Sequence, residues 1–391
     1  MEVDVAIVGA GPAGSTVAAL LAGRGFSVAV IDRDTFPRDK LCGEFLSWDA
    51  LPIADALGVT TLIDEAGAPR IGRCRIVGTH RDYEFAFPHE ARGVSRMLLD
   101  ALLLETAKKK GATALDGWTA TDLQTEGGLV VRPPGTSGRT ISPPSEQIPA
   151  RVTVGAWGRW GRFDQQLGRA FVRDRAHRSF GFKRHYTGAP PRNAIELYSF
   201  RDGYLGVNEI EGTRTNVCGL VSAQRLSGHK GRWDAFVDEL RDDEPLLDAM
   251  YARYTPAQEA FLSSEPVIFR ARSPVEAGVF MIGDASGIVD PLTGNGMAMA
   301  MQSALLAAPH IAALLNGRDR ATAENDYRRE HHAFFAPRIA WSRRVARLLS
   351  RPRLLDAALA TRANVGPMLV RRTRADRDLV ARLTDAWFSI Q

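Results

Sequence analysis

The feature that most constrains the fold is a glycine pattern, Gly-Ala-Gly-Pro-Ala-Gly, at residues 9–14. An apolar, largely β-branched run at residues 3–8 comes directly before it, and a helical pattern at residues 13–23 follows. A second apolar run, residues 26–31, ends on Asp32. Strand, glycine turn, helix and strand in this order predict a β-α-β unit, and therefore a parallel sheet with a right-handed crossover.

Each glycine has a separate physical role in such a unit. Gly9 permits the tight turn, Gly11 lets a pyrophosphate approach the backbone, and Gly14 lets the helix pack closely on the strand. The first turn of the helix offers free N–H groups and a partial positive charge to an anion. Asp32 stands 23 residues after Gly9, where its carboxylate can accept hydrogen bonds from ribose hydroxyls. The predicted dinucleotide contacts are Gly9, Gly11, Pro12, Ala13, Gly14, Asp32 and Arg33.

Composition narrows the class of protein. The chain has 391 residues, of which 45% are hydrophobic and 24% charged, so it can bury a large core and is not a disordered polymer. The three cysteines, Cys42, Cys74 and Cys218, form no CxxC pair, which argues against a zinc site or a disulfide framework. We therefore expect no metal and a reduced, cytoplasmic setting.

Charge does not indicate a nucleic-acid partner. The net charge is +5, but only six of the 50 basic residues are lysines, and the arginines are spread along the chain. Glu2 and Asp4 stand where a signal peptide would be basic. Residues 297–315 lack formal charge but contain polar side chains, which favours a buried helix over a membrane span. The arginine-rich residues 337–355 could contact a membrane surface, although packing on their own domain is favoured.

The rest of the chain divides by pattern. Residues 95–110 read as a helix with Ser95 as its N-cap, and residues 133–149 read as a surface loop or hairpin rich in Pro, Gly and Ser. Short alternating runs between 170 and 272, such as 194–200 and 215–221, predict a mostly antiparallel inserted sheet. Residues 327–391 are predicted to be helical, with breaks at Pro337, Pro352 and Pro367.

A second, distant motif identifies the dinucleotide. Residues 278–296, GVFMIGDASGIVDPLTGNG, resemble the GD motif of the FAD-dependent monooxygenases and their relatives. The resemblance implies that FAD is the cofactor, that Asp284 bonds its ribityl chain, and that backbone amides at 294–296 face the pyrimidine edge of the flavin. It also places Arg96 alongside the cofactor. The further contacts implied are Arg96, Gly283, Asp284, Pro291, Gly294, Asn295 and Gly296.

Residues 36–44, FPRDKLCGE, look most like the geranylgeranyl reductase branch of that superfamily. The resemblance places Cys42 and Gly43 near the isoalloxazine ring. Cys42, the one tentative catalytic residue, is either a thiol that tunes the flavin or transfers a proton, or a small packing residue. Both interpretations stay open. Ionising this thiol at neutral pH would need an activating neighbour such as Lys40 or Arg38.

Two departures from family patterns and one histidine pair bear on the function. Trp157 stands where aromatic hydroxylases carry the Asp of an Asp-Gly motif, so direct use of NAD(P)H is in question, and a separate flavin reductase or electron-donor protein is the alternative. The WxWxI signature of flavin halogenases is not present, because Trp157 and Trp160 have the wrong spacing, so halogenation ranks low. His331 and His332 are adjacent and are predicted to be surface residues rather than a metal pair.

The resemblance implies an α/β fold: a Rossmann-like FAD-binding domain (1–75, 93–168 and 273–330), an inserted antiparallel β-sheet substrate domain (76–92 and 169–272) and a C-terminal helical region (331–391). The substrate would be an apolar small molecule, such as a polyketide, an aromatic or an isoprenoid. Hydroxylation or epoxidation by a flavin C4a-hydroperoxide is favoured. The alternatives are reduction of a carbon–carbon double bond and a non-enzymatic flavin-binding module.

Overall fold

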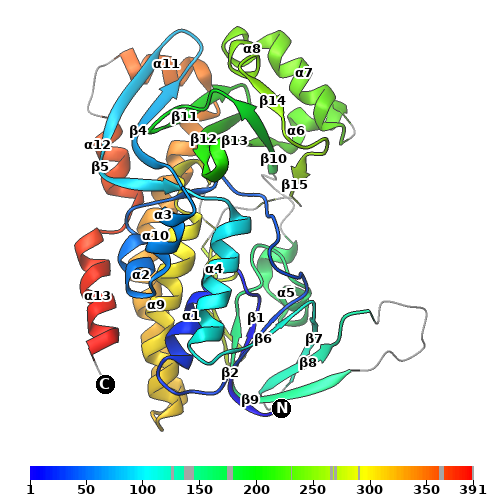
Figure 1. Cartoon of the computed structure of the whole chain (residues 1–391), viewed down its shortest axis with the longest axis vertical. Helices are drawn as coiled ribbons and strands as arrows, with labels where there is room; N and C mark the ends of the chain where they lie inside the picture. The colour runs from blue at the N-terminus through cyan, green and yellow to red at the C-terminus, as the bar shows by residue number, and fades with distance from the viewer. Residues whose placement is uncertain are drawn as a thin grey trace.

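Two sheets and a set of long helices make up the computed structural model (Figure 1). It describes residues 1–124, 127–135, 145–173, 179–229, 231–264, 267, 271–288, 291–360 and 365–389. Most of the segment that is rich in Pro, Gly and Ser lies outside the described residues. The mixed α/β architecture confirms the fold class expected from the sequence.

The first sheet has the strand order β16-β17-β9-β1-β2-β6. Its strands are β1 (Val3–Val8), β2 (Val28–Asp32), β6 (Thr113–Asp116), β9 (Glu146–Gly155), β16 (Val275–Glu276) and β17 (Val279–Met281). From β17 to β6 every pair is parallel, and β1 lies between β9 and β2. A hairpin of β7 (Thr119–Leu123) and β8 (Gly128–Arg132) extends from β9. The β-α-β unit predicted around the glycine pattern is therefore present.

Helices α1 (Pro12–Ala22), α4 (Arg96–Lys109) and α9 (Gly296–Leu315) pack together beside this sheet. All residues of α1 are buried, and the Ser95 hydroxyl caps α4 by accepting from the Leu98 N–H at 3.1 Å, as expected. In the part of the chain that the structure describes, α9 alone is long and apolar enough to cross a membrane. Its most apolar stretch is 72% buried inside the protein, which agrees with the expected core helix.

The second sheet has the order β14-β10-β13-β12-β11-β4-β5-β3 and is antiparallel except between β4 and β11. Its strands are β3 (Phe45–Leu46), β4 (Arg70–Val77), β5 (Asp82–Gly93), β10 (Ser179–Gly188), β11 (Ala194–Phe200), β12 (Gly203–Ile210), β13 (Arg214–Ser222) and β14 (Tyr254–Pro256), with β15 (Leu262–Ser263) on β10. The runs at 194–200 and 215–221 are strands, as predicted. The proposed domain boundary at 75/76 falls inside β4, all of which lies in this sheet.

Short helices complete the two halves. Near the first sheet lie α2 (Leu51–Ala56), α3 (Val59–Glu65), α5 (Arg162–Gln166) and the 3₁₀ turns η1 (Ala170–Arg173) and η4 (Gly283–Ala285). The 3₁₀ turn η5 (Pro291–Thr293) contacts β12 of the second sheet and α10. At the second sheet lie α6 (Ala223–Leu226), α7 (Trp233–Asp243), α8 (Pro245–Tyr251), η2 (Glu211–Thr213) and η3 (Ser227–His229). A separate apolar core joins α7 and α8 to that sheet through Phe182, Phe200 and Phe236.

The C-terminal region is helical, with α10 (Arg320–Leu349), α11 (Pro352–Ala360), α12 (Val365–Thr373) and α13 (Arg377–Ser389). The predicted break at Pro337 is wrong, because α10 continues through it. Packing of α10 on α9 and α12 supports the helix where proline removes one hydrogen bond. Pro352 does begin a new helix, whereas Pro367 lies inside α12. Helix α12 contacts β5 and α11 contacts β11, so this region covers the second sheet (Figure 1).

Candidate functional site

The glycine turn after β1 is too crowded for any other residue. A Cβ at Gly14 would overlap the carbonyl oxygen of Gly9, and a Cβ at Gly9 would overlap the carbonyl oxygen of Ala156 on the neighbouring segment. Gly9 also has a φ of +103°, which L-residues rarely adopt. The turn therefore brings the start of α1 against the sheet. Gly11, its N-cap, offers no side-chain hydrogen bond there, which suits capping by a bound anion.

The two sequence motifs, about 270 residues apart, meet at this helix start. Gly283 has a φ of +60°, and a Cβ on it would lie 3.0 Å from the Cβ of Ala13. Its N–H donates to the Ser303 hydroxyl of α9 at 2.7 Å. Asp284 follows, with one carboxylate oxygen 3.6 Å from Nε of Arg159. The structure thus joins the phosphate-binding turn and the GD motif into one site.

Charged side chains border the turn. A Cβ on Gly11 would lie 3.5 Å from Nη2 of Arg96, so this guanidinium faces the loop where a pyrophosphate would lie. Asp100 holds Arg96 through bonds of 2.8 and 2.6 Å and also pairs with Arg38. Burial alone would lower the pKa of Arg96, but Asp100 raises it above its usual value. Arg96 is therefore a fixed cation at the site.

Asp32 lies at the end of β2, as predicted, and has local partners. Oδ2 accepts from the N–H of Ala10 at 2.8 Å, and Oδ1 accepts from the N–H of Asp34 at 3.0 Å. Each carboxylate oxygen has a second lone pair for a ribose hydroxyl. The side chain of Arg33 is 75% exposed and lies 3.9 Å from Asp34, so it is the most peripheral of the predicted contacts.

The start of α9 is the second place where backbone amides are available. Pro291 begins the 3₁₀ turn η5, Gly294 adopts a φ of +61° against Phe45, and Asn295 is the buried N-cap. A Cβ on Gly296 would meet nothing within 4 Å. The same is true of Gly43, so both positions leave room beside the backbone. These open glycines, with the crowded Gly9 and Gly14, fit an extended dinucleotide.

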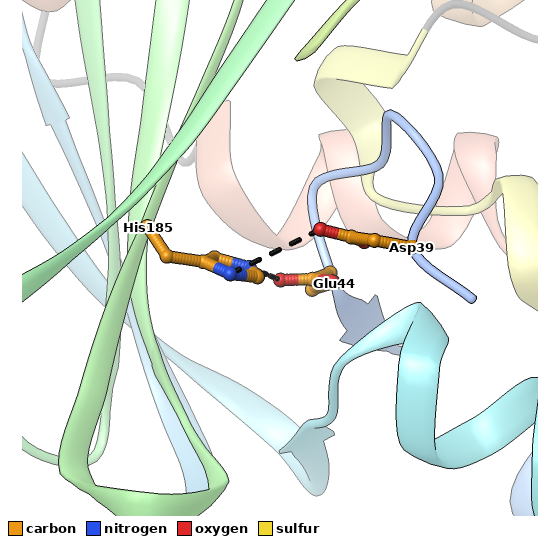
Figure 2. Close-up of side chains that lie close together, drawn as sticks. All are labelled: Asp39, Glu44 and His185. Carbon is orange, nitrogen blue, oxygen red and sulfur yellow. Dashed lines mark hydrogen bonds and ion pairs between the residues drawn. The ribbon is translucent and has the colours of Figure 1, made fainter. Parts of the chain in front are cut away.

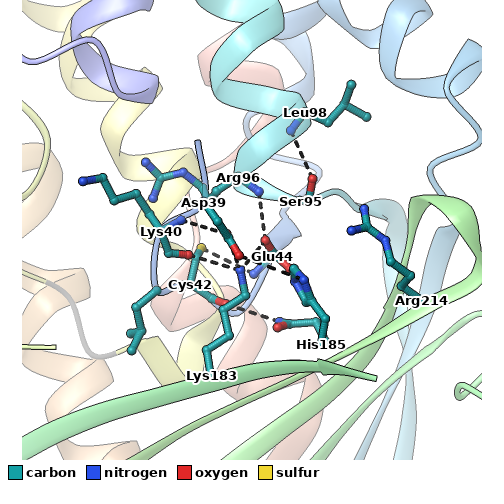
Figure 3. Close-up of polar contacts among 12 residues, drawn as sticks. Asp39, Lys40, Cys42, Glu44, Ser95, Arg96, Leu98, Lys183, His185 and Arg214 are labelled. Carbon is teal, nitrogen blue, oxygen red and sulfur yellow. Dashed lines mark hydrogen bonds and ion pairs between the residues drawn. The ribbon is translucent and has the colours of Figure 1, made fainter. Parts of the chain in front are cut away.

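Sequence reasoning missed a buried polar cluster beside Cys42. The carboxylate of Glu44 approaches Nε2 of His185 at 2.6 Å (Figure 2). It also accepts from Nζ of Lys183 at 2.6 Å. Lys183 also donates to Asp39 at 2.6 Å, and the backbone N–H of Arg96 donates to Glu44 at 2.9 Å (Figure 3). Residues 183 and 185 are two positions apart on β10, so their side chains lie on the same face of the strand. That spacing was the signal in the sequence that could have revealed the cluster.

The cluster is not a metal site. Asp39, Glu44 and His185 offer ligand atoms within 4.8 Å of one another, but the Lys183 ammonium already lies between the two carboxylates. Burial alone would lower the pKa of Lys183, and Glu44 and Asp39 outweigh it, so the pKa is raised. The lysine therefore stays charged. Glu44 itself adopts a φ of +51°, a strained backbone that these bonds hold in place.

Cys42 is half-buried and keeps its proton. Its Sγ accepts from the N–H of Glu44 at 3.4 Å, and its carbonyl accepts from Asn216 on β13 at 3.3 Å. Burial raises the pKa of the Cys42 thiol, although the charges of Arg96 and Lys183 act in the opposite direction. Neither neighbour suggested by the sequence activates it. Lys40 pairs with Asp34, and Arg38 pairs with Asp100.

An apolar cavity of about 50 Å³ lies between the second sheet and the C-terminal helices. It is lined by Phe45, Cys74, Ile76, Phe85, Phe87, Ile195, Leu197, Leu292, Thr293, Gly294, Val345, Leu349, Leu369, Val370, Thr373 and Arg374. Gly294, just before α9, connects it with the predicted flavin contacts.

Two other sequence interpretations can be compared with the structure. Trp157 donates through Nε1 to Asp164 at 3.3 Å and packs on Phe163, with ring centroids 5.2 Å apart. It therefore serves packing behind the turn. The surface assignment of His331 is wrong: it is buried, and its Nε2 lies 2.9 Å from the hydroxyl of Ser286. His332 is exposed, as expected.

Comparison with known proteins gives one family match and related sequences. The model of the FAD binding domain family matches residues 2–342. A tryptophan 2-halogenase of Chondromyces crocatus is 28% identical over 361 residues, covering 88% of this chain and 67% of that protein. A menaquinone reductase of Mycobacterium tuberculosis is 28% identical over 389 residues, covering 95% of this chain and 88% of that protein.

Solved structures agree on the fold. A flavin-dependent brominase superposes with a TM-score of 0.77 at 20% identity, covering 98% of this chain and 93% of the other. A geranylgeranyl bacteriochlorophyll reductase-like protein from Thermoplasma acidophilum gives 0.73 at 19% identity, covering 100% and 92%. Both contain the same succession of sheets and helices at large sequence distance, so they inform the fold alone.

Proposed function

The chain belongs to the FAD binding domain family, and on that premise we propose that it is an FAD-dependent oxidoreductase that reduces a carbon–carbon double bond of an apolar small molecule. FAD is the cofactor, as the two motifs indicated. Two parts of the proposal go beyond the family match: the kind of bond that is reduced and the source of the electrons. They rest on Cys42 and on the cavity beside Gly294.

The chain's own residues would hold the cofactor along an extended line. The amides of Ala13 and Gly14 and the guanidinium of Arg96 would hold the pyrophosphate, and Asp32 the adenosine ribose. Asp284 would bind the ribityl chain, and the backbone at 294–296 the flavin edge. Negative charge on a reduced flavin would be stabilised there by the N-terminus of α9. When bound in its reduced form, FAD would supply the hydride chemistry, and the residues above would hold it in place.

The observation that carries the proposal is the position of the Cys42 thiol, which is half-buried, accepts from the N–H of Glu44 at 3.4 Å and lies next to the open Gly43. Reducing a double bond needs a hydride on one carbon and a proton on the other. The Cys42 S–H bond would break as the new C–H bond forms, leaving its electron pair on sulfur as a thiolate. The charges of Arg96 and Lys183, which already favour ionisation of this thiol, would stabilise that thiolate. Solvent would then return the proton.

The apolar cavity supports the same reaction. Phe45, Leu292 and Leu197 would bind the hydrocarbon part of the substrate next to Gly294. Such surroundings favour an apolar substrate by removing its surface from water. They also keep water from the hydride donor. The menaquinone reductase of Mycobacterium tuberculosis matches 95% of this chain, and its name describes a reductase, which supports this type of reaction.

This proposal reverses the preference for a monooxygenase that the sequence suggested. The reason is the position of Cys42: a half-buried thiol next to the open Gly43 would be able to donate a proton to a substrate there. An oxygen-dependent reaction, which would put an oxygen atom on the substrate, is the second candidate. The 28% identical tryptophan 2-halogenase does not favour oxygen transfer to the substrate, but it weakens the low ranking of halogenation.

We also propose that electrons come from a separate flavin reductase or donor protein. Trp157 occupies the place of the hydroxylases' Asp and is engaged by Asp164 and Phe163. It therefore offers no carboxylate toward a nicotinamide. Adding NADPH alone to the oxidised holoenzyme should leave the flavin oxidised, whereas a general flavin reductase with NADPH should bleach it.

The reaction type can be tested with dithionite-reduced holoenzyme and menaquinone-4 as the probe. Under anaerobic conditions we expect substrate-dependent return of the visible flavin absorption. After reoxidation of the quinone ring in air, the product should still be heavier by two hydrogens, which distinguishes a reduced side-chain double bond from a quinol. Reoxidation by oxygen alone, with oxygen in the product, would instead establish the second candidate. If the probe affects neither reaction, the protein is a flavin-binding module or uses another substrate, and the reductase proposal fails for this probe class.

The role of Cys42 is tested in the same assay. Cys42→Ser should slow anaerobic reoxidation by about 10²–10⁴-fold, the usual contribution of a positioned proton donor, while FAD content stays constant. Cys218→Ser is the matched control, because Cys218 is also a half-buried free thiol with a raised pKa. Equal rates in both variants would remove Cys42 from the mechanism.

A further inference from the structure

Two nitrogens of one guanidinium at the apolar cavity lack a hydrogen-bond partner among the described residues. Arg374, directly after α12, is the only charged side chain among the lining residues that the structure describes. Its Nε and Nη1 are buried without a hydrogen-bond partner among the described residues. The guanidinium carbon lies 4.6 Å from the ring centroid of Trp48 and 5.5 Å from that of Phe45. The aromatic rings fix its position but cannot accept its N–H groups as an oxygen would.

The charges behind Arg374 do not balance it. Asp49 is buried and accepts through Oδ2 from Gln302 at 3.1 Å and from the N–H of Ala375 at 3.0 Å. The same oxygen lies 3.5 Å from the buried guanidinium of Arg338. Oδ1 of Asp49 has no hydrogen-bond partner among the described residues. Asp49 attracts Arg374 electrostatically, but burial outweighs this attraction and lowers the pKa of Arg374. The buried Arg338 and the half-buried Arg374 thus have one carboxylate between them, which leaves an excess of positive charge beside the cavity.

Such an arrangement is costly without a ligand. A buried charge is stable only when it is paired and hydrogen-bonded, and here burial lowers the pKa of both Arg338, to about 10, and Arg374. A planar guanidinium with free N–H groups matches a carboxylate in geometry as well as in charge. Arg374 also lines the apolar cavity, which would hold the hydrocarbon part of the same ligand.

We infer that the substrate carries a carboxylate at one end of its apolar body, and that Arg374 binds this carboxylate from the cavity wall. The inference rests on the proposed function only in taking this cavity as the substrate site. A neutral substrate of the same shape leaves the guanidinium unpaired, so the charged end determines specificity. The apolar body, packed between Phe85, Leu197 and Val370, contributes affinity without selecting for charge.

The test compares two probes of similar shape, 4-butylbenzoate and 4-butylbenzyl alcohol, bound to the oxidised holoenzyme. Calorimetry gives the affinities, and the visible flavin spectrum reports binding near the ring. We expect the carboxylate to bind about ten- to a hundredfold more tightly, the usual gain of hydrogen bonds to a charged group. Equal affinities in the unaltered protein would overturn the inference without any mutation.

Substitution identifies the residue. Arg374→Met should remove the preference, lowering benzoate affinity about ten- to a hundredfold and leaving the alcohol nearly unchanged. Arg371→Met, an exposed arginine on α12, is the matched control and should keep the preference. Loss of affinity for both probes alike in Arg374→Met would assign the arginine a structural role only. Arg374→Lys, which keeps the charge but not the planar fork, should retain part of the preference.

Failure of this inference is distinct from failure of the proposed function. If a preparation holds FAD and reduces its substrate but binds both probes equally, only the inference that the substrate carries a carboxylate is contradicted. A preparation that prefers benzoate but shows no anaerobic reoxidation contradicts the reductase and leaves the role of Arg374 intact.

Discussion

Nζ of Lys183 lies 2.6 Å from Oε1 of Glu44, and this ion pair fastens the antiparallel sheet to the loop that carries Cys42 and Gly43 (Figure 3). Both side chains are fully buried. Glu44 in turn accepts from the backbone N–H of Arg96 at the start of α4. The carboxylate of Glu44 therefore links β10 of the second sheet to the start of α4, which packs beside the first sheet.

Removing the lysine should destabilise the protein strongly. Lys183→Met leaves two carboxylates without their shared cation, and breaking a buried pair costs about 3–5 kcal/mol. We expect a correspondingly lower free energy of unfolding in urea. The double variant Lys183→Met with Glu44→Gln should recover part of this loss, because the unpaired charge on Glu44 is gone. An unchanged midpoint in the single variant would contradict the pairing.

The same pair has a pH dependence of definite sign. The folded-state pKa of Lys183 is raised, so its stabilisation is fully present below the ordinary lysine value of 10.5 and is lost as pH rises through the folded value. The unfolding free energy of the unaltered protein should therefore decline above about pH 10.5 more than that of Lys183→Met. Urea titrations at several alkaline pH values measure this difference.

The glycine turn makes a steric prediction. Gly14→Ala places a methyl group against the carbonyl oxygen of Gly9, backbone that cannot move aside, so the purified variant should contain little or no FAD. Gly228→Ala is the matched control, because a Cβ there meets nothing within 4 Å. The ratio of visible flavin absorption to protein concentration is the measurement. Normal FAD content in Gly14→Ala would show that the turn does not hold the cofactor.

Asp32 is predicted to bind the adenosine ribose. Asp32→Ala should weaken FAD binding about ten- to a hundredfold, since hydrogen bonds to a carboxylate contribute about 1.5–3 kcal/mol. Titration of the deflavinated protein with FAD, followed by flavin fluorescence, gives the dissociation constant. Asp122→Ala, an exposed aspartate on β7, should bind as the unaltered protein does. Equal affinity of the two variants would reject the ribose contact.

His331 should make the protein sensitive to acid. Burial, together with the neighbouring His332, lowers the pKa of His331 to about 4. Between about pH 6.5 and 4 the unfolded chain binds a proton that the folded protein does not, which should cost about 3 kcal/mol of stability across that interval. His331→Gln should flatten this decline, and the exposed His332→Gln should not. Parallel pH profiles for all three proteins would contradict the buried neutral histidine.

Much of the cofactor half could be predicted from the sequence, because its signals are local. Gly9, Gly14 and the apolar runs around them dictate strand, turn and helix through steric limits and periodicity that act over a few residues. The GD motif identified FAD for the same reason: its glycines and Asp284 follow one another on the chain. The family match confirms both the cofactor and the fold.

The tertiary structure decided what depends on residues far apart in sequence. Glu44, Lys183 and His185 meet because β10 packs across the loop after residue 36, and Arg374 reaches the cavity because α12 folds back onto β5. Charge pairing and desolvation act through space. Neither the raised pKa of the Cys42 thiol nor the unpaired Nε and Nη1 of Arg374 could therefore be predicted from spacing along the chain. Likewise Pro337 continues a helix and His331 is buried, because packing between distant segments outweighs local preference.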